Sequence, residues 1–285
     1  MLCLSDAPDA VDRWLCILLL TVGSDAIPQK NHSVVWRSLG EGELRGMLNI
    51  AFSTLSETGG HPVNEDFLDV SVMPERFSFI LCDGLGGHGN GDIASRFVVQ
   101  QMKRALERSE SIEESILEAQ RKLLQKQEEE NAKNSMKTTV ACLTLSEDFA
   151  RFAHVGDSRI YYFEKSKYKM RSQDHSIPQM LVNRGDIREK DIRHHEDRCR
   201  LLRVMGTEWD APKYQVVDGI SLTKQSSFLL CSDGFWELID EKMMCKTLKK
   251  ADSPKQWLSD MERVVLENGE GTNMDNYSAI AVFVR

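Results

Sequence analysis

Several acidic residues in this sequence stand where a short apolar segment ends or begins. Residues 77–82 (FSFILC) run directly into Asp83 and Gly84, and residues 228–231 (FLLC) are followed, one residue later, by Asp233. Other acidic residues occupy comparable positions: Glu65, Asp66, Asp157 and Asp275. Short apolar segments of this kind are typical of buried strands. The sequence therefore predicts that carboxylates gather at the strand ends of one domain.

Such a group of carboxylates can be interpreted in two ways. A single Asp-Gly pair is usually a turn, and a single acidic residue at a strand end is usually a cap. Several acidic strand ends in one domain, however, repel one another unless a cation compensates their charge. Oxygen ligands without a His or Cys pattern favour Mg²⁺ or Mn²⁺ over zinc. We therefore predict a divalent metal site that includes Asp83.

The elements that must position these residues follow from the apolar periodicity. Strands are predicted at residues 48–54, 66–72, 77–82, 138–145, 151–155, 160–164, 228–231 and 277–284. Helices are predicted at residues 93–106, 112–131, 235–250 and 254–268, with a mixed, helical insert at about 175–184. Because strands come in clusters and helices in pairs, we expect an α+β layered domain rather than alternating βαβ units. Residues 47–285 are expected to form this one domain, and residues 1–46 an N-terminal extension that is either not native or disordered.

The composition excludes some classes of partner. The net charge of −8 provides no basic surplus for nucleic acid. The apolar segment at residues 14–22 is too short to span a membrane, and the acidic residues before it are untypical of a signal peptide. Seven cysteines without a CxxC pair indicate reduced thiols. We expect a cytoplasmic monomer that binds neither nucleic acid nor membrane.

Seven motifs along the chain resemble those of one family. In order they are NED (64–66), DGLGGH (83–88), HVGDSR (154–159), QDHS (173–176), LLRVMG (201–206), CSDGFWE (231–237) and DNYS (275–278). Together they resemble the metal-dependent protein phosphatases, the type 2C serine/threonine phosphatases, and DGLGGH is similar to the bacterial branch. The resemblance implies a four-layer αββα sandwich with two mainly antiparallel sheets packed face to face.

The resemblance also implies roles for individual residues. Asp83 would bridge two metal ions, and the Gly84 carbonyl would help to hold one of them. Asp233 and Asp275 would complete the coordination of the other ion. Three further residues would act at the edge of the site, partly through water or on a third, weaker ion: Glu65, Asp66 and Asp157.

The activity implied by the resemblance is hydrolysis of phosphoserine and phosphothreonine in proteins, in opposition to a serine/threonine kinase. Two Mn²⁺ or Mg²⁺ ions would supply a bridging hydroxide that attacks phosphorus, as two-metal sites do. Two alternatives stay open. One is a pseudophosphatase that binds phosphoproteins without hydrolysing them. The other is a hydrolase of small phosphoesters.

Two positions depart from the family pattern. His61 stands where the family usually has an arginine that binds the substrate phosphate, so we assign His61 a catalytic role in phosphate binding. An imidazole lacks the forked and permanent charge of a guanidinium, and we expect weaker phosphate binding and a steeper loss of activity above neutral pH. Leu85 stands where animal relatives have a histidine that protonates the leaving group. His88 or a metal-bound water could serve instead.

Residues 175–200 resemble the mobile flap of the bacterial members. The many charged residues of this segment either form a solvated surface or contact the flanking residues of a phosphopeptide. The first interpretation is preferred.

Overall fold

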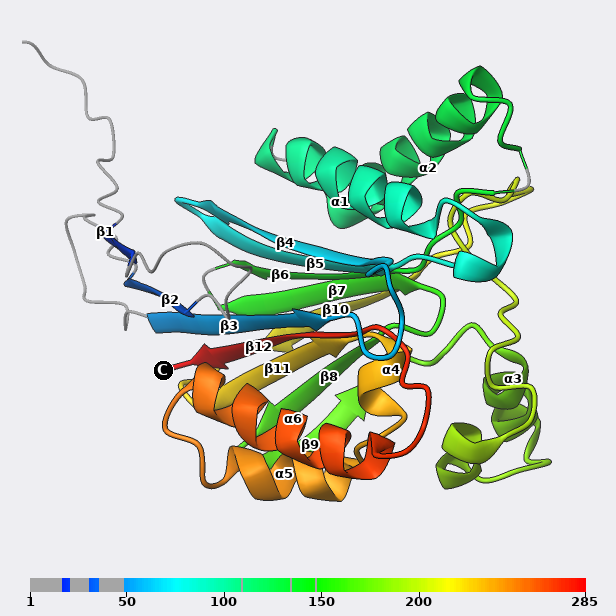
Figure 1. Ribbon diagram of the computed structural model, residues 1–285. Helices are drawn as coiled ribbons and strands as arrows, with labels where there is room; N and C mark the ends of the chain where they lie inside the picture. The colour runs from blue at the N-terminus through cyan, green and yellow to red at the C-terminus, as the bar shows by residue number, and fades with distance from the viewer. Residues whose placement is uncertain (1–16, 21–30, 36–48, 109, 134, 147) are drawn as a thin grey trace, which may run out of the picture.

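Two antiparallel β-sheets pack face to face, and helices cover the outer face of each sheet (Figure 1). This computed structural model describes residues 17–20, 31–35, 49–108, 110–133, 135–146 and 148–285. The predicted α+β fold with four αββα layers is therefore confirmed.

Every pair of neighbouring strands in the two sheets is antiparallel. The seven-stranded sheet contains, in spatial order, β1 (Ile17–Leu20), β2 (Asn31–Val35), β3 (Asn49–Glu57), β12 (Tyr277–Val284), β11 (Ser226–Cys231), β8 (Arg159–Glu164) and β9 (Lys167–Arg171). The five-stranded sheet contains β10 (Gln215–Ser221), β7 (Phe149–Val155), β6 (Val140–Ser146), β5 (Arg76–Asp83) and β4 (Asp66–Met73).

Strand β5 shows why these segments are almost continuously apolar. Phe79 and Leu81 belong to the core between the two sheets, and Ile80 and Cys82 belong to the core beneath the helices. Because side chains alternate between the two faces of a strand, a strand that is covered on both faces needs apolar residues at every position. Phe79 packs edge to face on Phe52 of β3, with ring centroids 5.4 Å apart, and so joins the two sheets.

The helices bury their apolar faces on the sheets. Helices α1 (Gly91–Glu107) and α2 (Ile112–Glu129) cover the five-stranded sheet. Helices α4 (Asp233–Trp236), α5 (Glu241–Leu248) and α6 (Pro254–Gly269) cover the seven-stranded sheet. The remaining elements lie beyond one end of the sheets: η1 (Gly86–His88), α3 (Ile177–Arg184) and η2 (Glu189–His194) (Figure 1).

Some expected elements differ from the observed ones. The helix expected at residues 235–250 is divided into α4 and α5, because the Asp240 side chain accepts a hydrogen bond from the Met243 N–H (2.7 Å) and starts a new helix. The strand expected from residue 138 begins at Val140, and Thr138 instead forms isolated bridges with Gly84 and Met205. Strands β9 and β10 were not predicted, because their sequences are largely polar or exposed.

Two short strands lie within residues 1–46. Strands β1 and β2 pair with each other, and β2 pairs with β3. The rest of residues 1–46 lies outside the described residues, as does most of the apolar segment 14–22, so the division at residue 47 stays a prediction. None of the helices in the described part of the chain has the length and apolar character that a bilayer span requires.

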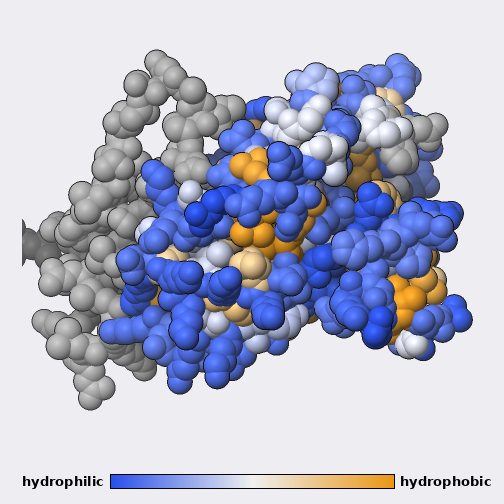
Figure 2. All heavy atoms as spheres, turned by 60° about the horizontal axis from the view of Figure 1, so that its bottom comes forward, coloured by the Kyte–Doolittle hydropathy of each residue, from blue (hydrophilic) through white to orange (hydrophobic). Residues whose placement is uncertain are grey.

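The surface in Figure 2 is mostly hydrophilic, with small hydrophobic patches. Among the described residues, the large apolar side chains that are exposed are scattered over many elements: Val63, Ile93, Leu117, Phe149, Tyr168, Met180, Leu202 and Leu266. Single exposed apolar residues of this kind are normal for a globular protein.

Candidate metal centre

The acidic strand ends meet at one edge of the sandwich. Asp66 at the start of β4 lies directly opposite Asp83 at the end of β5 in the strand register. Asp157 follows β7, which belongs to the same sheet. Asp233 follows β11 and Asp275 precedes β12, and both of these strands belong to the other sheet. The two sheets therefore bring carboxylates from distant parts of the sequence to one place.

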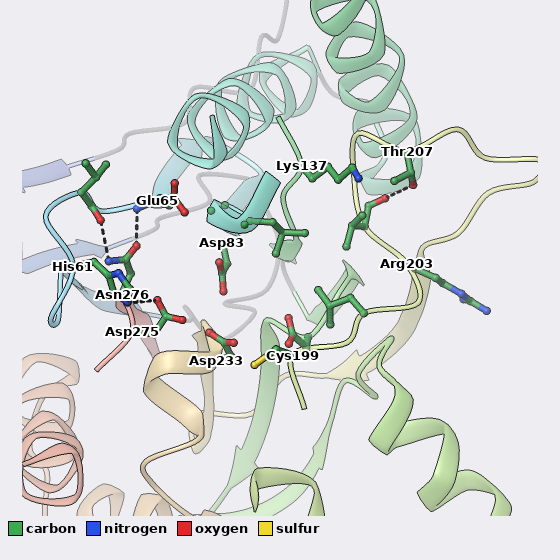
Figure 3. A pocket seen from close by; sticks show the side chains of 18 of the residues that line it. His61, Glu65, Asp83, Lys137, Cys199, Arg203, Thr207, Asp233, Asp275 and Asn276 are labelled. Carbon is green, nitrogen blue, oxygen red and sulfur yellow. Dashed lines mark hydrogen bonds and ion pairs between the residues drawn. The ribbon is translucent and has the colours of Figure 1, made fainter. Parts of the chain in front are cut away.

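These residues surround a cleft of about 810 Å³. The Asp83 and Asp233 carboxylates point toward each other across it, and Glu65 and Asp275 lie on one side (Figure 3). Seven of the predicted site residues line the cleft: His61, Glu65, Asp83, Gly84, Asp157, Asp233 and Asp275. Asp66, the eighth, is buried beside it and accepts a hydrogen bond from the Ser232 hydroxyl (2.7 Å).

Burial and mutual repulsion raise the pKa of four aspartates in or beside the cleft. Burial, followed by the charges of Asp233 and Asp66, raises the pKa of Asp83 well above its usual range. Burial, followed by the charges of Glu237 and Asp275, raises the pKa of Asp233 to about 7. Burial likewise raises the pKa of Asp66 to about 8, and it raises that of Asp157 well above its usual range. This site needs positive charge that the surrounding side chains do not supply.

The donor groups fit a hard divalent cation. They are oxygens, and one of them, Oδ1 of Asp66, is buried without a hydrogen-bond partner in the described residues. Among those residues, no group of three or more His, Cys, Asp or Glu side chains is arranged so that it could hold a metal ion by itself. Main-chain carbonyl and water ligands, together with small side-chain rotations, would therefore have to complete the coordination.

The glycines after Asp83 allow the backbone to enter this crowded site. A Cβ atom on Gly84 would lie 2.2 Å from the Gly91 carbonyl oxygen and 2.7 Å from that of Glu65. A Cβ atom on Gly86 would lie 2.1 Å from Oε2 of Glu65. At position 84 only glycine fits, because the clash is with backbone atoms, whereas a side chain at position 86 would displace the Glu65 carboxylate from the turn that follows Asp83.

Asn276 organises one wall of the cleft, and no role was predicted for it. Its Oδ1 accepts a hydrogen bond from the Glu65 N–H (2.8 Å), and its Nδ2 donates to the carbonyl oxygens of Thr58 (2.8 Å) and Val63 (3.1 Å). Asn276 thereby connects the loop before β4 to the segment that carries Asp275. The only sequence signal for this role was its position in the DNYS motif.

His61 lies in the cleft beside a predicted metal ligand. Its Nε2 is 3.5 Å from Oδ1 of Asp275. The imidazole therefore lies beside one carboxylate of the acidic centre. Its assignment to phosphate binding stays a prediction.

The substitution His61→Arg tests this assignment. We expect the arginine to lower the KM for a phosphopeptide by about threefold to tenfold, because a guanidinium binds phosphate through two parallel hydrogen bonds. We also expect a smaller loss of activity above neutral pH, because arginine stays charged where imidazole does not. Steady-state pH–rate profiles of the wild type, His61→Arg and the neutral control His61→Gln would measure both effects. An unchanged KM in His61→Arg would refute the assignment.

Most of the other residues named from the sequence are buried or cannot transfer a proton. Leu85 lines the cleft and cannot transfer a proton, and the side chain of His88 is outside the described part of the structure. The rings of His154 and His175 are buried and stacked, with centroids 4.6 Å apart, and burial lowers their pKa to about 4 and about 3. Cys82 and Cys231 are buried too, and burial raises the pKa of both thiols.

Comparison with known proteins identifies relatives of this chain. A sequence model of the family described as Protein phosphatase 2C matches residues 57–276. The serine/threonine phosphatase stp of Listeria monocytogenes is 32% identical over 182 residues, which are 60% of this chain and 71% of that protein. The protein phosphatase PhpP of Streptococcus pneumoniae is 26% identical over 186 residues, 62% of this chain and 74% of that protein.

Solved structures have the same fold. The serine/threonine phosphatase Stp1 from Staphylococcus aureus is 25% identical and superposes with a TM-score of 0.73, covering 87% of this chain and 100% of that one. The catalytic domain of the phosphatase PstP, solved in complex with two manganese ions, is 20% identical and superposes with a TM-score of 0.69, covering 83% of this chain and 99% of that one.

Proposed function

The chain belongs to the protein phosphatase 2C family, a family of phosphoprotein phosphatases, and on this premise we propose that it hydrolyses phosphoserine and phosphothreonine in proteins with two divalent cations. The observation that carries the proposal is the group of carboxylates around Asp83, whose charge the surrounding side chains do not compensate. The manganese ions in the PstP structure support divalent cations as the missing charge.

Each residue has a task in this proposal. Asp83, at the end of β5, would contact both ions. The Gly84 carbonyl would help to hold one ion, and Asp233 and Asp275 would hold the other. The unpartnered Oδ1 of Asp66 would accept a hydrogen bond from a water molecule that is bound to an ion. Ser232 orients Asp66, because its hydroxyl donates to Oδ2 of Asp66 (2.7 Å) while accepting the Ser278 N–H (2.9 Å). Glu65 and Asp157 flank the centre and would hold further water or a third, weaker ion.

The bound cations would supply the attacking hydroxide and neutralise the phosphoryl oxygens. The substrate phosphate would lie next to Asp83, and His61 on one wall of the cleft would contact it. The described side chains around Asp83 include no cysteine or serine in a nucleophile–base arrangement, so we assign no covalent intermediate.

Two other functions use the same site. A pseudophosphatase would bind phosphoproteins without hydrolysing them, and a small-phosphoester hydrolase would act on free metabolites. Catalysis on proteins is favoured because the predicted metal-binding carboxylates lie together in or beside one cleft and the cleft is open at the surface. The opposing kinase, the monomeric state and the cytoplasmic location stay predictions from the sequence.

Hydrolysis of a phosphothreonine peptide by the EDTA-treated protein, with and without Mn²⁺, tests the proposal. We expect phosphate release that depends on Mn²⁺ and falls at least about 100-fold in Asp233→Asn, because a charged group at the reaction centre is lost. Asp252→Asn, which changes an exposed carboxylate away from the cleft, is the matched control and should be as active as the wild type.

Two further measurements distinguish the alternatives. One is calorimetric titration of the protein with Mn²⁺, and the other is hydrolysis of a second substrate. If the wild type and Asp233→Asn are equally inert although Mn²⁺ binds to the wild type, the pseudophosphatase is the correct function. If p-nitrophenyl phosphate is hydrolysed and phosphopeptides are not, the protein is a small-phosphoester hydrolase.

A further inference from the structure

The cleft has a second end that the proposed chemistry does not use. Lys137 and Arg203 line the cleft on the side opposite His61, Glu65 and Asp275 (Figure 3). Lys137 extends toward Thr207, and Arg203 extends outward along the rim, away from Asp83 (Figure 3). The cleft therefore changes from an acidic centre to a basic rim along its length.

The backbone holds these two residues on one rigid wall. Thr138 and Met205 form an antiparallel bridge, with the Met205 N–H donating to the Thr138 carbonyl (2.8 Å). Lys137 is the residue before this bridge, and its carbonyl accepts the Leu85 N–H (2.9 Å). The bridge thus places Lys137 and Arg203 on adjacent segments, next to the turn that carries Asp83.

Helix α2 fixes the segment that follows Arg203. Gln120 Oε1 accepts the Gly206 N–H (2.9 Å), and Gln127 Nε2 donates to the Gly206 carbonyl (2.9 Å). The Trp209 indole N–H donates to the Val204 carbonyl (3.1 Å). Because buried side chains of a packed helix hold this segment from behind, its front can present charge to a ligand without moving.

This end of the cleft carries two positive charges. In the described part of the chain, neither Lys137 nor Arg203 forms an ion pair, whereas nearby arginines do: Arg193 with Glu241, Arg198 with Glu237 and Arg200 with Asp197. Lys137 and Arg203 are the lysine and the arginine that line the cleft, and no ion pair in the described part of the chain compensates their charges. They can be neutralised by an anion from outside the protein.

We propose that Lys137 and Arg203 bind an anionic side chain that flanks the phosphorylated residue, so that the enzyme prefers phosphopeptides with a neighbouring glutamate, aspartate or second phosphoresidue. This inference rests on the proposed function, because it assumes that the phosphorylated residue lies at Asp83. The shared chemistry of the flanking group is an oxyanion, and a carboxylate and a phosphate differ in charge and in the number of acceptor oxygens.

Three phosphothreonine peptides that differ only in the flanking residues test the preference. The flanking residues are alanine, glutamate or a second phosphothreonine. We expect the wild-type kcat/KM to be about threefold to tenfold higher for the glutamate peptide than for the alanine peptide, as one or two exposed ion pairs allow. A greater gain for the doubly phosphorylated peptide would identify phosphate as the preferred flanking anion.

Lys137→Gln and Arg203→Gln remove the two charges separately. In each variant the glutamate-to-alanine ratio of kcat/KM should fall toward one, and it should rise again toward the wild-type value in Lys137→Arg. Lys255→Gln is the matched control, since Lys255 is exposed on α6 and does not line the cleft, and its ratio should equal that of the wild type. An equal loss on all three peptides would place Lys137 at the reacting phosphate instead and overturn the inference.

Peptide binding separates this inference from the proposed function. Fluorescence anisotropy of the same labelled peptides, without Mn²⁺, needs no turnover. If no peptide is hydrolysed but the glutamate peptide binds more tightly and Lys137→Gln abolishes the difference, the proposed function fails and the subsite stands. If the peptides are hydrolysed and neither rate nor binding depends on the flanking residue, the subsite is refuted alone.

Discussion

Replacing Asp83 by asparagine is expected to lower kcat/KM by about 10³-fold, as removal of a preorganised charged group does, and at the same time to stabilise the metal-free protein. The first effect follows from the position of Asp83 between the other carboxylates of the cleft. The second follows from the cost of holding a partly buried charge next to Asp233 and Asp66 without a cation. A residue that costs stability but is needed for activity is typical of a functional site.

The stabilising effect requires that the substitution leave the local structure intact. The Asp83 N–H donates to the Thr139 hydroxyl (3.0 Å), and the Asp83 carbonyl accepts from the Thr139 N–H (2.8 Å) and the Thr138 hydroxyl (2.7 Å). All three bonds use the main chain of Asp83 and persist in the variant. Asparagine has nearly the same volume as aspartate, so no cavity forms.

The stability gain should depend on pH. The pKa of Asp83 is raised in the folded protein, so the wild type loses stability as the pH rises above about 4, where the unfolded chain ionises. The gain in Asp83→Asn should therefore be absent below about pH 4 and should grow as the pH rises toward neutral. Saturating Mn²⁺ should reverse the order, because it stabilises the wild type by mass action and binds the variant less well.

Thermal unfolding followed by circular dichroism, with EDTA or with Mn²⁺, measures these effects. A gain of 1 kcal/mol corresponds to about 2–4 °C in Tm for a domain of this size. Asp69→Asn on the same strand as Asp66 is the control, because Asp69 is partly exposed and pairs with Lys103 (2.8 Å). A Tm below that of the wild type for metal-free Asp83→Asn would contradict the prediction.

Removing the buried Arg159 side chain should cause the largest loss of stability, about 3–5 kcal/mol, because the Asp174 carboxylate stays buried and keeps only its more distant contact with Arg171 (3.2 Å). Nε and Nη2 of Arg159 donate to the two carboxylate oxygens of Asp174 at 2.8 and 2.6 Å. Nη1 donates to the Tyr161 hydroxyl (3.0 Å), and the guanidinium lies over the Trp236 ring, 3.3 Å from its centroid. Both Arg159 and Asp174 have side chains only 1% exposed.

This ion pair also supports the proposed metal site. The Trp236 indole N–H donates to the Asp157 carbonyl (3.0 Å), and Trp236 ends the short helix α4 that begins at Asp233. Although burial acts to raise the pKa of Asp174, the charges of Arg159 and Arg171 hold it below its usual range. We therefore expect Arg159→Met to lower the affinity for Mn²⁺ as well as the stability.

Urea unfolding of Arg159→Met, Asp174→Leu and the double variant measures the coupling between the two residues. The double variant should recover part of the lost stability, because an apolar pair replaces the ion pair without leaving a charge unpaired. Arg188→Met is the control, since Arg188 forms an exposed pair with Asp191 and its loss should leave the unfolding midpoint unchanged. A midpoint for Arg159→Met equal to that of Arg188→Met would disprove the structural role of the pair.

Local patterns in the sequence were sufficient to predict an α+β fold with carboxylates at its strand ends, whereas the four-layer arrangement was predicted from the resemblance to the family. Strands such as β5 and β11 are recognisable because burial on both faces requires apolar residues at consecutive positions. Asp83 is the last residue of β5 and Asp233 comes two residues after the end of β11, so their placement at a strand end needs no information from elsewhere in the chain. Strands β9 and β10 lie at sheet edges and are partly exposed, so they lack this pattern and were missed.

Only the tertiary structure decided which side chains and segments around the cleft contact one another. The contact of His61 with Asp275, the hydrogen bond from Ser232 to Asp66 and the bridge that places Lys137 beside the Arg203 segment all join residues far apart in the sequence. A residue's type and its neighbours along the chain determine whether it lies at a strand end or in a loop. The atom that it contacts across the sandwich depends on how the two sheets pack, and no local pattern specifies that packing.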